Sequence, residues 1–457
     1  MKQHTILHLI TKLTLLFLLL TGCSKFLDVR PSTTAVNPTT VSDFEEMLNN
    51  DSIATCNFVL ADVVTDDVGM SDAMLAADRT AYFAHAYLWD ANVWNPGDAD
   101  ITYNSAYARI LQMNIILDKI DGAAGEAQRK NVVRAQALIN RAWYYLQLAN
   151  LYGPDYREAT MTTDLAVPLV LMPNANELPA RATVKQVYDQ ILGDLHAAVT
   201  NPDLPDKGKT VVHPGKAAGY ALLAKTYLYM GNYGQAETSA DAALQINNAL
   251  TDYNAGNVHP GSLLDLSRNP EILLGRLGVD YAFYQKYGGG GFFIGASLHT
   301  LLDSNDMRLI GNFAANTRFN PNTMYTAQVF NYSVTVAEML LVKAECLARK
   351  GNAAGAVDLV NQLRKKRLIR YVPLDPGINA LTAVLQERQR ELFYHGGTRL
   401  FDLKRLNRES GLAQTLQRIG DDGTTVIATL PANSPRYLMP FAPSIIANNP
   451  KIIQNGR

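Results

Sequence analysis

The sequence predicts a mainly α-helical fold, in which a scaffold of paired helices is interrupted by an irregular, loop-rich region that we expect to bind a ligand. Apolar residues recur at spacings of three and four along most of the chain, which is typical of amphipathic helices. One helix–turn–helix pattern occurs twice. A stretch at about 250–333 is instead rich in Gly, Asn, Tyr and Phe. Such a long irregular stretch in a compact fold is usually functional or disordered, and a surface insertion without function is the alternative.

The N-terminus predicts export and lipid anchoring. A weakly basic start is followed by the apolar run 13–20 and by small residues at 21–22, the pattern of a secretory signal. This run is too short to span a membrane, which takes roughly 20 residues. Cys23 follows directly, as in a bacterial lipobox. We therefore expect residues 1–22 to be a signal peptide, Cys23 to be acylated and 23–38 to form a tether. An ordinary signal peptide with a chance cysteine is the alternative.

Composition excludes several classes of function. Loss of residues 1–22 removes two lysines and no acidic residue, which changes the formal charge from −1 to −3. This near-neutral balance gives no basic footprint for nucleic acid. Cys56 and Cys346 remain, and we favour two separate packed thiols, although a disulfide between them stays open. No two cysteines have the spacing of a zinc site, so the sequence predicts neither a metal nor a cofactor.

Local signals place the helices in order. A helix is predicted over 41–48, where Ser42 as N-cap and Glu45 three residues later form a capping box. Apolar spacings predict further helices at 103–120, 129–152, 183–199, 214–230 and 233–244. Trp143 falls within the second of these and is expected in the core.

An internal similarity links two distant helix pairs. Four residues recur at an offset of 120: Ala224, Gly231, Asn232 and Ala236 correspond to Ala344, Gly351, Asn352 and Ala356. Both segments are typical of an apolar helix, a Gly-Asn turn and a small-residue helix, and they resemble a tetratricopeptide repeat. Such repeats have a period of about 34 residues, so the helical scaffold must be interrupted between the two copies.

A search for catalytic motifs finds little. No two of the six histidines of the mature chain stand four residues apart, and there is no G-x-S-x-G elbow. The glycines at 288–295 are not followed by Lys-Ser/Thr, so they predict a flexible loop. Asp66-Asp67 and Asp98 with Asp100 are candidate acid pairs for glycoside hydrolysis, but solvated loop acids are the favoured interpretation. The run 364–367 is interpreted as a solvated, charged helix end.

Aromatic and polar residues at two places favour sugar binding. The apolar face of a pyranose stacks on flat aromatic rings, while polar side chains satisfy its hydroxyl groups. The first region contains Trp89, Asn92 and Trp94, and the second contains Tyr281, Tyr284 and Tyr287. These six residues are the predicted ligand-binding residues. For Trp89 and Trp94 the alternative is packing against the helix below.

Several blocks occur in a fixed order along the mature chain. They lie at 134–137, 141–145, 151–154, 337–345, 361–364, 387–392, 399–405, 449–450 and 454–455. Together with the lipobox and the interrupted tetratricopeptide helices, these blocks resemble the SusD/RagB family of nutrient-binding lipoproteins. The resemblance covers essentially the whole mature chain and implies a single SusD-like domain over 39–457, with the irregular insertion at about 250–333.

Two departures from the family pattern concern local packing. The family usually has an acidic residue and one glycine before the arginine that corresponds to Arg399, whereas this chain has His395-Gly396-Gly397-Thr398. The closing motif also lacks its usual proline. Both positions resemble scaffold blocks, so the departures bear on packing more than on function.

The resemblance implies a function outside the cytoplasm. Family members resemble lids seated on a SusC-like, TonB-dependent transporter barrel, where they capture an oligosaccharide, or occasionally a peptide, at the outer-membrane surface. The membrane contact would be the lipid on Cys23, and no catalysis is implied. The alternatives are a surface glycoside hydrolase and a structural adaptor that uses its helical repeats for protein contacts alone.

Overall fold

The computed structural model describes residues 37–174, 177–255, 266–280, 283, 292–312 and 329–457. The chain divides into two units, Met1–Thr40 and Val41–Arg457, and each is considered by itself. The predicted signal peptide, the lipidation of Cys23 and most of the tether lie outside the described residues. Among the helices that are described, none combines the length and the apolar character that a bilayer span requires.

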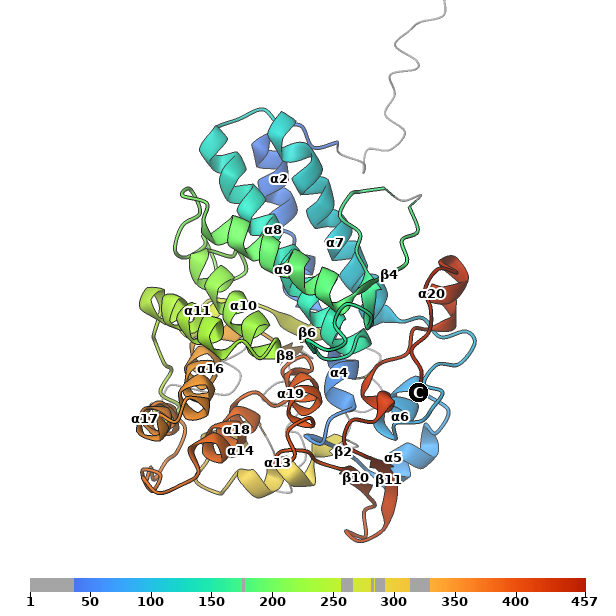
Figure 1. Ribbon diagram of the computed structural model, residues 1–457, viewed down its shortest axis with the longest axis vertical. Helices are drawn as coiled ribbons and strands as arrows, with labels where there is room; N and C mark the ends of the chain where they lie inside the picture. The colour runs from blue at the N-terminus through green and yellow to red at the C-terminus, as the bar shows by residue number, and fades with distance from the viewer. Residues whose placement is uncertain (1–36, 175–176, 256–265, 281–282, 284–291, 313–328) are drawn as a thin grey trace, which may run out of the picture. The chain divides into compact units, whose positions relative to one another are not determined.

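A series of helices packs side by side in chain order and forms the scaffold of residues 41–457 (Figure 1). In order, these helices are α7 (Ile101–Lys119), α8 (Ala127–Tyr152), α9 (Val184–Val199), α10 (Lys216–Tyr229), α11 (Tyr233–Ile246), α16 (Val336–Arg349), α17 (Ala353–Arg364) and α18 (Ala380–Glu391). The mainly α-helical prediction is therefore confirmed, and the predicted helix ends lie close to the observed ones.

The repeated helix pairs are α10–α11 and α16–α17, and α11 packs directly against α16. Gly231 and Gly351 have φ of 76° and 85°, a left-handed conformation that glycine adopts without strain. The next residues, Asn232 and Asn352, each cap the following helix by accepting a backbone N–H bond, at 3.2 and 3.0 Å. The two turns thus use the same chemistry, and the chain between the two pairs leaves the stack and returns to it.

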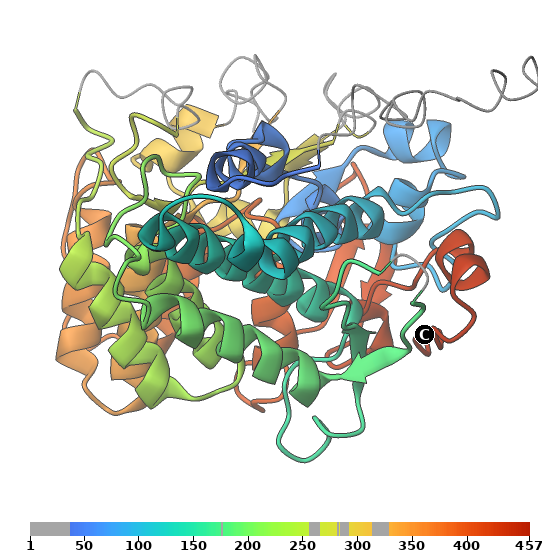
Figure 2. The same cartoon turned by 90° about the horizontal axis from the view of Figure 1, so that it is seen from above.

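The remaining helices described within residues 41–457 are shorter. The helices are α2 (Val41–Leu48), α3 (Asp51–Ala54), α4 (Val59–Val63), α5 (Asp72–Ala77), α6 (Tyr82–Tyr87), η2 (Ile120–Gly122), α13 (Ala296–Leu301), α14 (Met307–Asn312), α19 (Thr398–Leu406), η4 (Pro435–Tyr437) and α20 (Pro443–Asn448). Helix α2 packs on α8 (Figure 2). It begins at Val41, so Ser42 lies inside its first turn and accepts a bond from Arg129 at 3.0 Å, and the predicted capping role of Ser42 is wrong.

Short strands join segments that are distant in the sequence. β1 (Thr55–Cys56) pairs in parallel with β6 (Leu277–Val279), which pairs antiparallel with β8 (Val329–Asn331). The other pairs are antiparallel: β2 (Val68–Met70) with β7 (Phe292–Ile294), β3 (Leu165–Pro168) with β4 (Arg181–Thr183), β5 (Ile272–Leu274) with β9 (Val334–Thr335), and β10 (Leu416–Ile419) with β11 (Val426–Leu430). Strands β1 and β2 thereby bind the region after α11 to the segment before α7.

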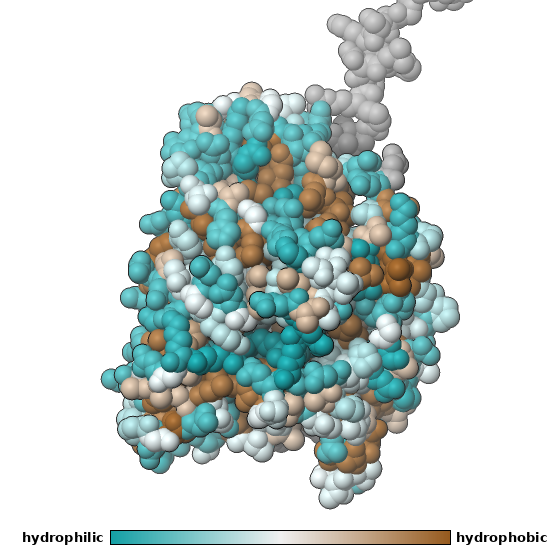
Figure 3. Space-filling model, in the orientation of Figure 1, coloured by the Kyte–Doolittle hydropathy of each residue, from teal (hydrophilic) through white to brown (hydrophobic). Residues whose placement is uncertain are grey.

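The core is built around α8. Trp143 on this helix is 2% exposed and meets Phe58 edge to face, with ring centroids 5.7 Å apart, so its predicted core position is confirmed. Cys56 and Cys346 are both buried free thiols, as favoured from the sequence. On the face shown in Figure 3, hydrophilic residues form most of the surface and hydrophobic residues occur as separate patches.

Buried ion pairs connect α19 to α18 and to α16 of the scaffold. Arg388 Nε lies 2.7 Å from Asp402, and Arg405 Nη2 donates to Glu345 at 2.7 Å. These charges come from the blocks at 387–392 and 399–405 and from α16. A buried charge is stable only when it is paired, so these blocks are scaffold, as the sequence indicates.

The charged run 364–367 differs from its prediction as a solvated helix end. Arg367 is fully buried and lies 2.8 Å from both Glu271 and Glu391, while Arg364 lies 3.1 Å from Glu387. Glu271 directly precedes β5, and Glu387 and Glu391 belong to α18, which packs against α17. Glu271 lies 96 residues from Arg367, and the α18 carboxylates lie 23 and 24 residues from their arginines, so the run by itself does not indicate its partners.

Candidate functional site

Helix α6 and the loop that follows it carry an aromatic surface. The rings of Tyr82 and Trp94 lie 5.1 Å apart at an angle of 31°, and both side chains are half-buried. Asn92 is exposed on the same loop. We call these three residues the Tyr82–Trp94 surface. Two tilted rings beside an amide supply both the apolar and the polar contacts that a sugar ring needs.

Hydrogen bonds hold the loop of this surface in place. Trp94 Nε1 donates to the carbonyl of Pro440 at 2.7 Å, which ties the ring to the C-terminal segment. Asn95 Nδ2 donates to Asp98 and to the carbonyl of Thr80, both at 2.9 Å. A surface that is already ordered loses little conformational entropy when a ligand binds.

Phe283, in the second predicted region, packs against helix α6, which directly precedes the first predicted region. Phe83 stacks on Tyr82 with centroids 4.2 Å apart and meets Phe283 at 5.1 Å. Phe283 belongs to the second predicted region, and the pairing of β2 with β7 joins two other segments, one on the N-terminal side of α6 and one after Phe283. The predicted ligand residues of that second region, Tyr281, Tyr284 and Tyr287, lie outside the described residues.

Trp89 is a correction to the predicted ligand residues. Its side chain is fully buried, and its Nε1 donates to the carbonyl of Val64 at 2.8 Å. The guanidinium of Arg418 lies 4.2 Å from the ring centroid, a cation–π contact. The residue has a φ of 54°, an unusual value for a bulky side chain, which turns the ring inward. Trp89 therefore packs the core and has no surface to offer a ligand.

Three residues at or near this surface are not predicted from the sequence. Tyr82 forms the second ring of the surface, and Arg79 and Asp90 form a half-exposed ion pair of 2.8 Å beside it. The cluster of aromatic residues at 82, 83 and 87 is the sequence feature from which Tyr82 could have been predicted as part of the surface. Arg79 precedes α6 in the sequence and Asp90 follows it, so their spacing gives no indication that the two side chains meet.

The adjacent acids Asp66 and Asp67 have structural partners. Asp66 accepts two bonds of 2.8 Å from Arg399, and this guanidinium holds the pKa of Asp66 below its ordinary value despite burial. Asp67 is 1% exposed, and burial raises its pKa to about 8, with the charge of Asp66 adding to the effect. Gln389 donates to Asp67 at 2.8 Å. This pair braces α18 and α19 against the segment before β2.

Asp98 and Asp100 also have local roles. Asp98 accepts the bonds of Asn95 that fix the aromatic loop. Asp100 is fully buried, caps α7 through the N–H of Tyr103 at 2.9 Å and accepts the hydroxyl of Tyr152 at 2.6 Å. Burial raises the pKa of Asp100 to about 6. Both carboxylates are therefore engaged in bonds that order the backbone.

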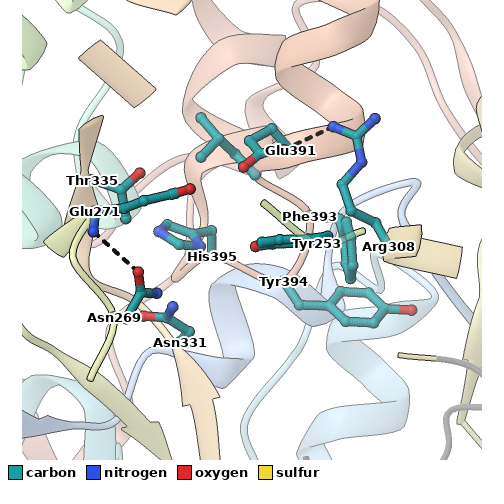
Figure 4. A pocket seen from close by; sticks show the side chains of 11 residues that line it. Tyr253, Asn269, Glu271, Arg308, Asn331, Thr335, Glu391, Phe393, Tyr394 and His395 are labelled. Atoms are coloured by element: carbon teal, nitrogen blue, oxygen red, sulfur yellow. Dashed lines mark hydrogen bonds and ion pairs between the residues drawn. The ribbon is translucent and has the colours of Figure 1, made fainter. Parts of the chain in front are cut away.

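A separate polar cavity of about 80 Å³ lies between the region after α11 and the turn that follows α18 (Figure 4). Tyr253, His395 and the carboxylate of Glu271 point toward the same space. Glu391 is held by Arg308 at 2.7 Å, and Glu271 by Arg367. The volume holds only about two or three water molecules, well below that of ordinary ligand pockets. Within the part of the chain that the structure describes, no group of three His, Cys, Asp or Glu residues is arranged to hold a metal.

Comparison with known families gives two matches that together take in most of the chain. Residues 25–228 match a SusD-like family described as "Starch-binding associating with outer membrane". Residues 315–456 match the SusD family. The first match ends before the irregular region, and the second begins at residue 315, within its last part.

Individual proteins agree with this result. SusD-like protein P2 of Formosa agariphila is 24% identical over 421 residues, covering 77% of this chain and 79% of that protein. A SusD superfamily protein of Bacteroides fragilis has a TM-score of 0.72 at 21% identity, over 91% of this chain and 99% of its own. Surface glycan-binding protein A of Bacteroides uniformis has a TM-score of 0.69 at 17% identity, over 91% and 100%. This chain belongs to the SusD/RagB family.

Proposed function

We propose that this chain is a lipid-anchored protein of the outer membrane that binds an oligosaccharide at the cell exterior and passes it to a SusC-like, TonB-dependent transporter. The observation that carries the proposal is the ordered Tyr82–Trp94 surface, with two rings 5.1 Å apart and the exposed Asn92 beside them. A peptide is the second class of ligand that the family resemblance implies.

The chemistry of this surface suits a sugar. One pyranose face would lie against the rings of Tyr82 and Trp94, and the equatorial hydroxyl groups would meet Asn92 and the ion pair of Arg79 with Asp90. Rings carry large contact areas with few rotors, so they lose little entropy on binding. The proposed role of Tyr281, Tyr284 and Tyr287 is to extend this platform from the neighbouring segment, which Phe283 brings against Phe83.

Relatives and sequence support the location. The family match over 25–228 carries the description of starch binding and outer-membrane association, and the Bacteroides uniformis relative is called a surface glycan-binding protein. We further propose that Cys23 carries the lipid and that 24–38 is the tether between the lipid and the single domain. The anchor would keep the protein beside its transporter.

A glycan panel tests this function directly. The mature protein is titrated calorimetrically with oligosaccharides of different linkage, and each mixture is then analysed by chromatography for shortened products. We expect saturable binding of at least one oligosaccharide, without any product. Release of shorter sugars would support the hydrolase alternative and contradict the proposal. Co-purification of a barrel without binding of any glycan or peptide would support the adaptor instead.

A further inference from the structure

A cavity of about 170 Å³ lies where the loop after α8, the end of α19 and the segment before η4 meet. We call it the Lys404 cavity. Its floor consists of the buried side chains of Asp155, Lys404, Asn407 and Tyr437, and exposed Asn433 lies at its rim. This space can hold roughly five water molecules, or one small chemical group.

The hydrogen-bond acceptors of this cavity already have partners. Asp155 Oδ1 accepts a hydrogen bond from Arg157 at 3.1 Å, and Oδ2 forms an ion pair with Arg408 but no well-formed hydrogen bond. Asp164 accepts a threonine hydroxyl at 2.6 Å. The side-chain oxygen of Asn407 accepts a backbone N–H at 2.9 Å. A ligand in this space therefore finds few acceptors to which it can donate.

The donors, in contrast, lack partners. Asn407 Nδ2, the hydroxyl of Tyr437 and Arg157 Nε have no hydrogen-bond partner among the residues that the structure describes. Asn407 is 2% exposed and Tyr437 is 4% exposed. Their side chains lie near each other, but no well-formed hydrogen bond joins them. Because buried polar groups are nearly always hydrogen-bonded, these donors indicate an acceptor that the chain itself does not provide.

The charges around the cavity favour an anion. Lys404 Nζ donates to the carbonyls of Asn150 and Gly153, at 2.5 and 2.6 Å, and so caps the end of α8. Lys404 and Arg157 line the cavity together with Asp155 and Asp164, and Arg408 adds a third positive charge from outside the lining through its ion pair with Asp155. Burial, together with the charge of Arg157, lowers the pKa of Lys404 to about 7. An anion bound nearby would favour the charged ammonium group.

We propose that the Lys404 cavity binds a small oxyanion, a carboxylate or sulfate group, carried by an acidic sugar or free in solution. The ligand must accept several hydrogen bonds and donate few, and an oxyanion is the group that does so most strongly, because charge-assisted hydrogen bonds are shorter and stronger than neutral ones. The residues of this cavity are distinct from the Tyr82–Trp94 surface, so the two proposals stand or fall separately.

Calorimetric titration at constant ionic strength tests this proposal. Sodium glucuronate, sodium sulfate and neutral glucose are titrated into the mature protein and into two variants. Tyr437→Phe deletes a hydroxyl that bonds to no described residue, so the fold is expected to persist. Asn407→Asp keeps the acceptor oxygen but places a negative charge where the free donor stood. The matched control is Tyr229→Phe, which deletes another buried, unpaired hydroxyl away from this cavity.

We expect at least one anion to bind saturably, with affinity about tenfold weaker in Tyr437→Phe, weaker still in Asn407→Asp and unchanged in Tyr229→Phe. Much tighter binding of glucuronate than of sulfate would identify a sugar-borne carboxylate, and similar affinities would identify the charged group alone. The proposal is overturned if neither anion binds, if glucose binds as tightly as glucuronate, or if both cavity variants keep the original affinity.

Discussion

Arg418 on β10 is 2% exposed, and its guanidinium donates to backbone carbonyls of segments near the N-terminus. The acceptors, at 2.7 to 2.9 Å, are Val63, Thr65, Val68 and Tyr87. The same group lies 3.8 Å from the ring centroid of Tyr87 and 4.2 Å from that of Trp89. One side chain thus fixes the backbone that leads into α6 and the aromatic loop.

Replacement of Arg418 by methionine tests this role. The aliphatic stem is retained, but four buried carbonyls lose their donor, and each unpaired buried group costs about 1–3 kcal/mol. We expect the free energy of unfolding, measured with urea, to fall by at least about 4 kcal/mol. The same substitution at Arg79, whose ion pair is half exposed, should cost less than about 1 kcal/mol. Equal losses in the two variants would contradict the bracing role.

Replacement of Asp66 by asparagine and replacement of the adjacent Asp67 by asparagine should have opposite effects on the free energy of unfolding. Burial raises the pKa of Asp67 to about 8, and its Oδ2 has no partner among the described residues. The unfolded value is about 3.9, so the folded state holds the proton more tightly. The free energy of unfolding should therefore fall as the pH rises from about 4 to about 8.

The variant Asp67→Asn stays neutral and should flatten this pH dependence, with a gain of about 1–3 kcal/mol at pH 8. Asp66→Asn instead leaves the buried guanidinium of Arg399 without its carboxylate and should lose about 3–5 kcal/mol at neutral pH. Urea titrations at several pH values measure both. Loss of stability in Asp67→Asn at pH 8, or an unchanged pH dependence, would contradict the raised pKa of Asp67.

Residue-scale predictions from the sequence depended on whether partners were local. Trp143 was assignable to the core because it falls within an apolar helical period. Trp89 was not, because Arg418, which covers its ring, comes from the other end of the chain. The burial of Arg367 is likewise absent from the local pattern, since Glu271 lies 96 residues before it and Glu391 lies 24 residues after it.

At the scale of elements, the turn before α19 explains the departure from the family pattern at 395–398. Gly396 and Gly397 have φ of 62° and 86°, and their N–H groups donate to the buried carboxylate of Asp62 at 3.2 and 2.7 Å. Tyr332 donates to the same carboxylate at 2.7 Å. Two consecutive glycines thus let the backbone wrap around an acid on α4.

Gly397→Ala should disrupt this turn. Its β-carbon would lie 2.7 Å from that of Ala61, and the left-handed φ adds strain. A loss of about 2 kcal/mol or more is expected in urea unfolding. Gly193→Ala, on an open face of α9, should instead gain about 0.5–1 kcal/mol, because alanine favours a helix. An unchanged free energy of unfolding in Gly397→Ala would mean that the turn adjusts without cost.

Sequence patterns predicted the helices well because helical spacing is a local property, as the Gly-Asn turns at 231–232 and 351–352 illustrate. The short strands were not predicted. β2 and β7 have only three residues each and form only when distant segments meet. Similarly, the contact of Phe83 with Phe283 joins residues 200 positions apart, which no local pattern encodes.

At the scale of the whole molecule, the proposed function requires both an anchor and a ligand surface. Substitution Cys23→Ser should prevent acylation, so labelled palmitate would no longer be incorporated and the protein would leave the outer-membrane fraction. The chain that keeps Cys23 should incorporate the label, and it should be cleaved by protease added to intact cells. Label incorporation in Cys23→Ser would contradict the assignment of the anchor.

Two tryptophans on the same loop allow a direct test of whether the Tyr82–Trp94 surface binds the oligosaccharide. Calorimetric titration with the best oligosaccharide of the panel is carried out on Trp94→Ala and on Trp89→Phe. We expect Trp94→Ala to weaken binding at least tenfold, because it removes half of the ring pair. Trp89→Phe should lower the melting temperature but leave the affinity unchanged, since its indole bonds to the core. An unchanged affinity in folded Trp94→Ala would contradict the account.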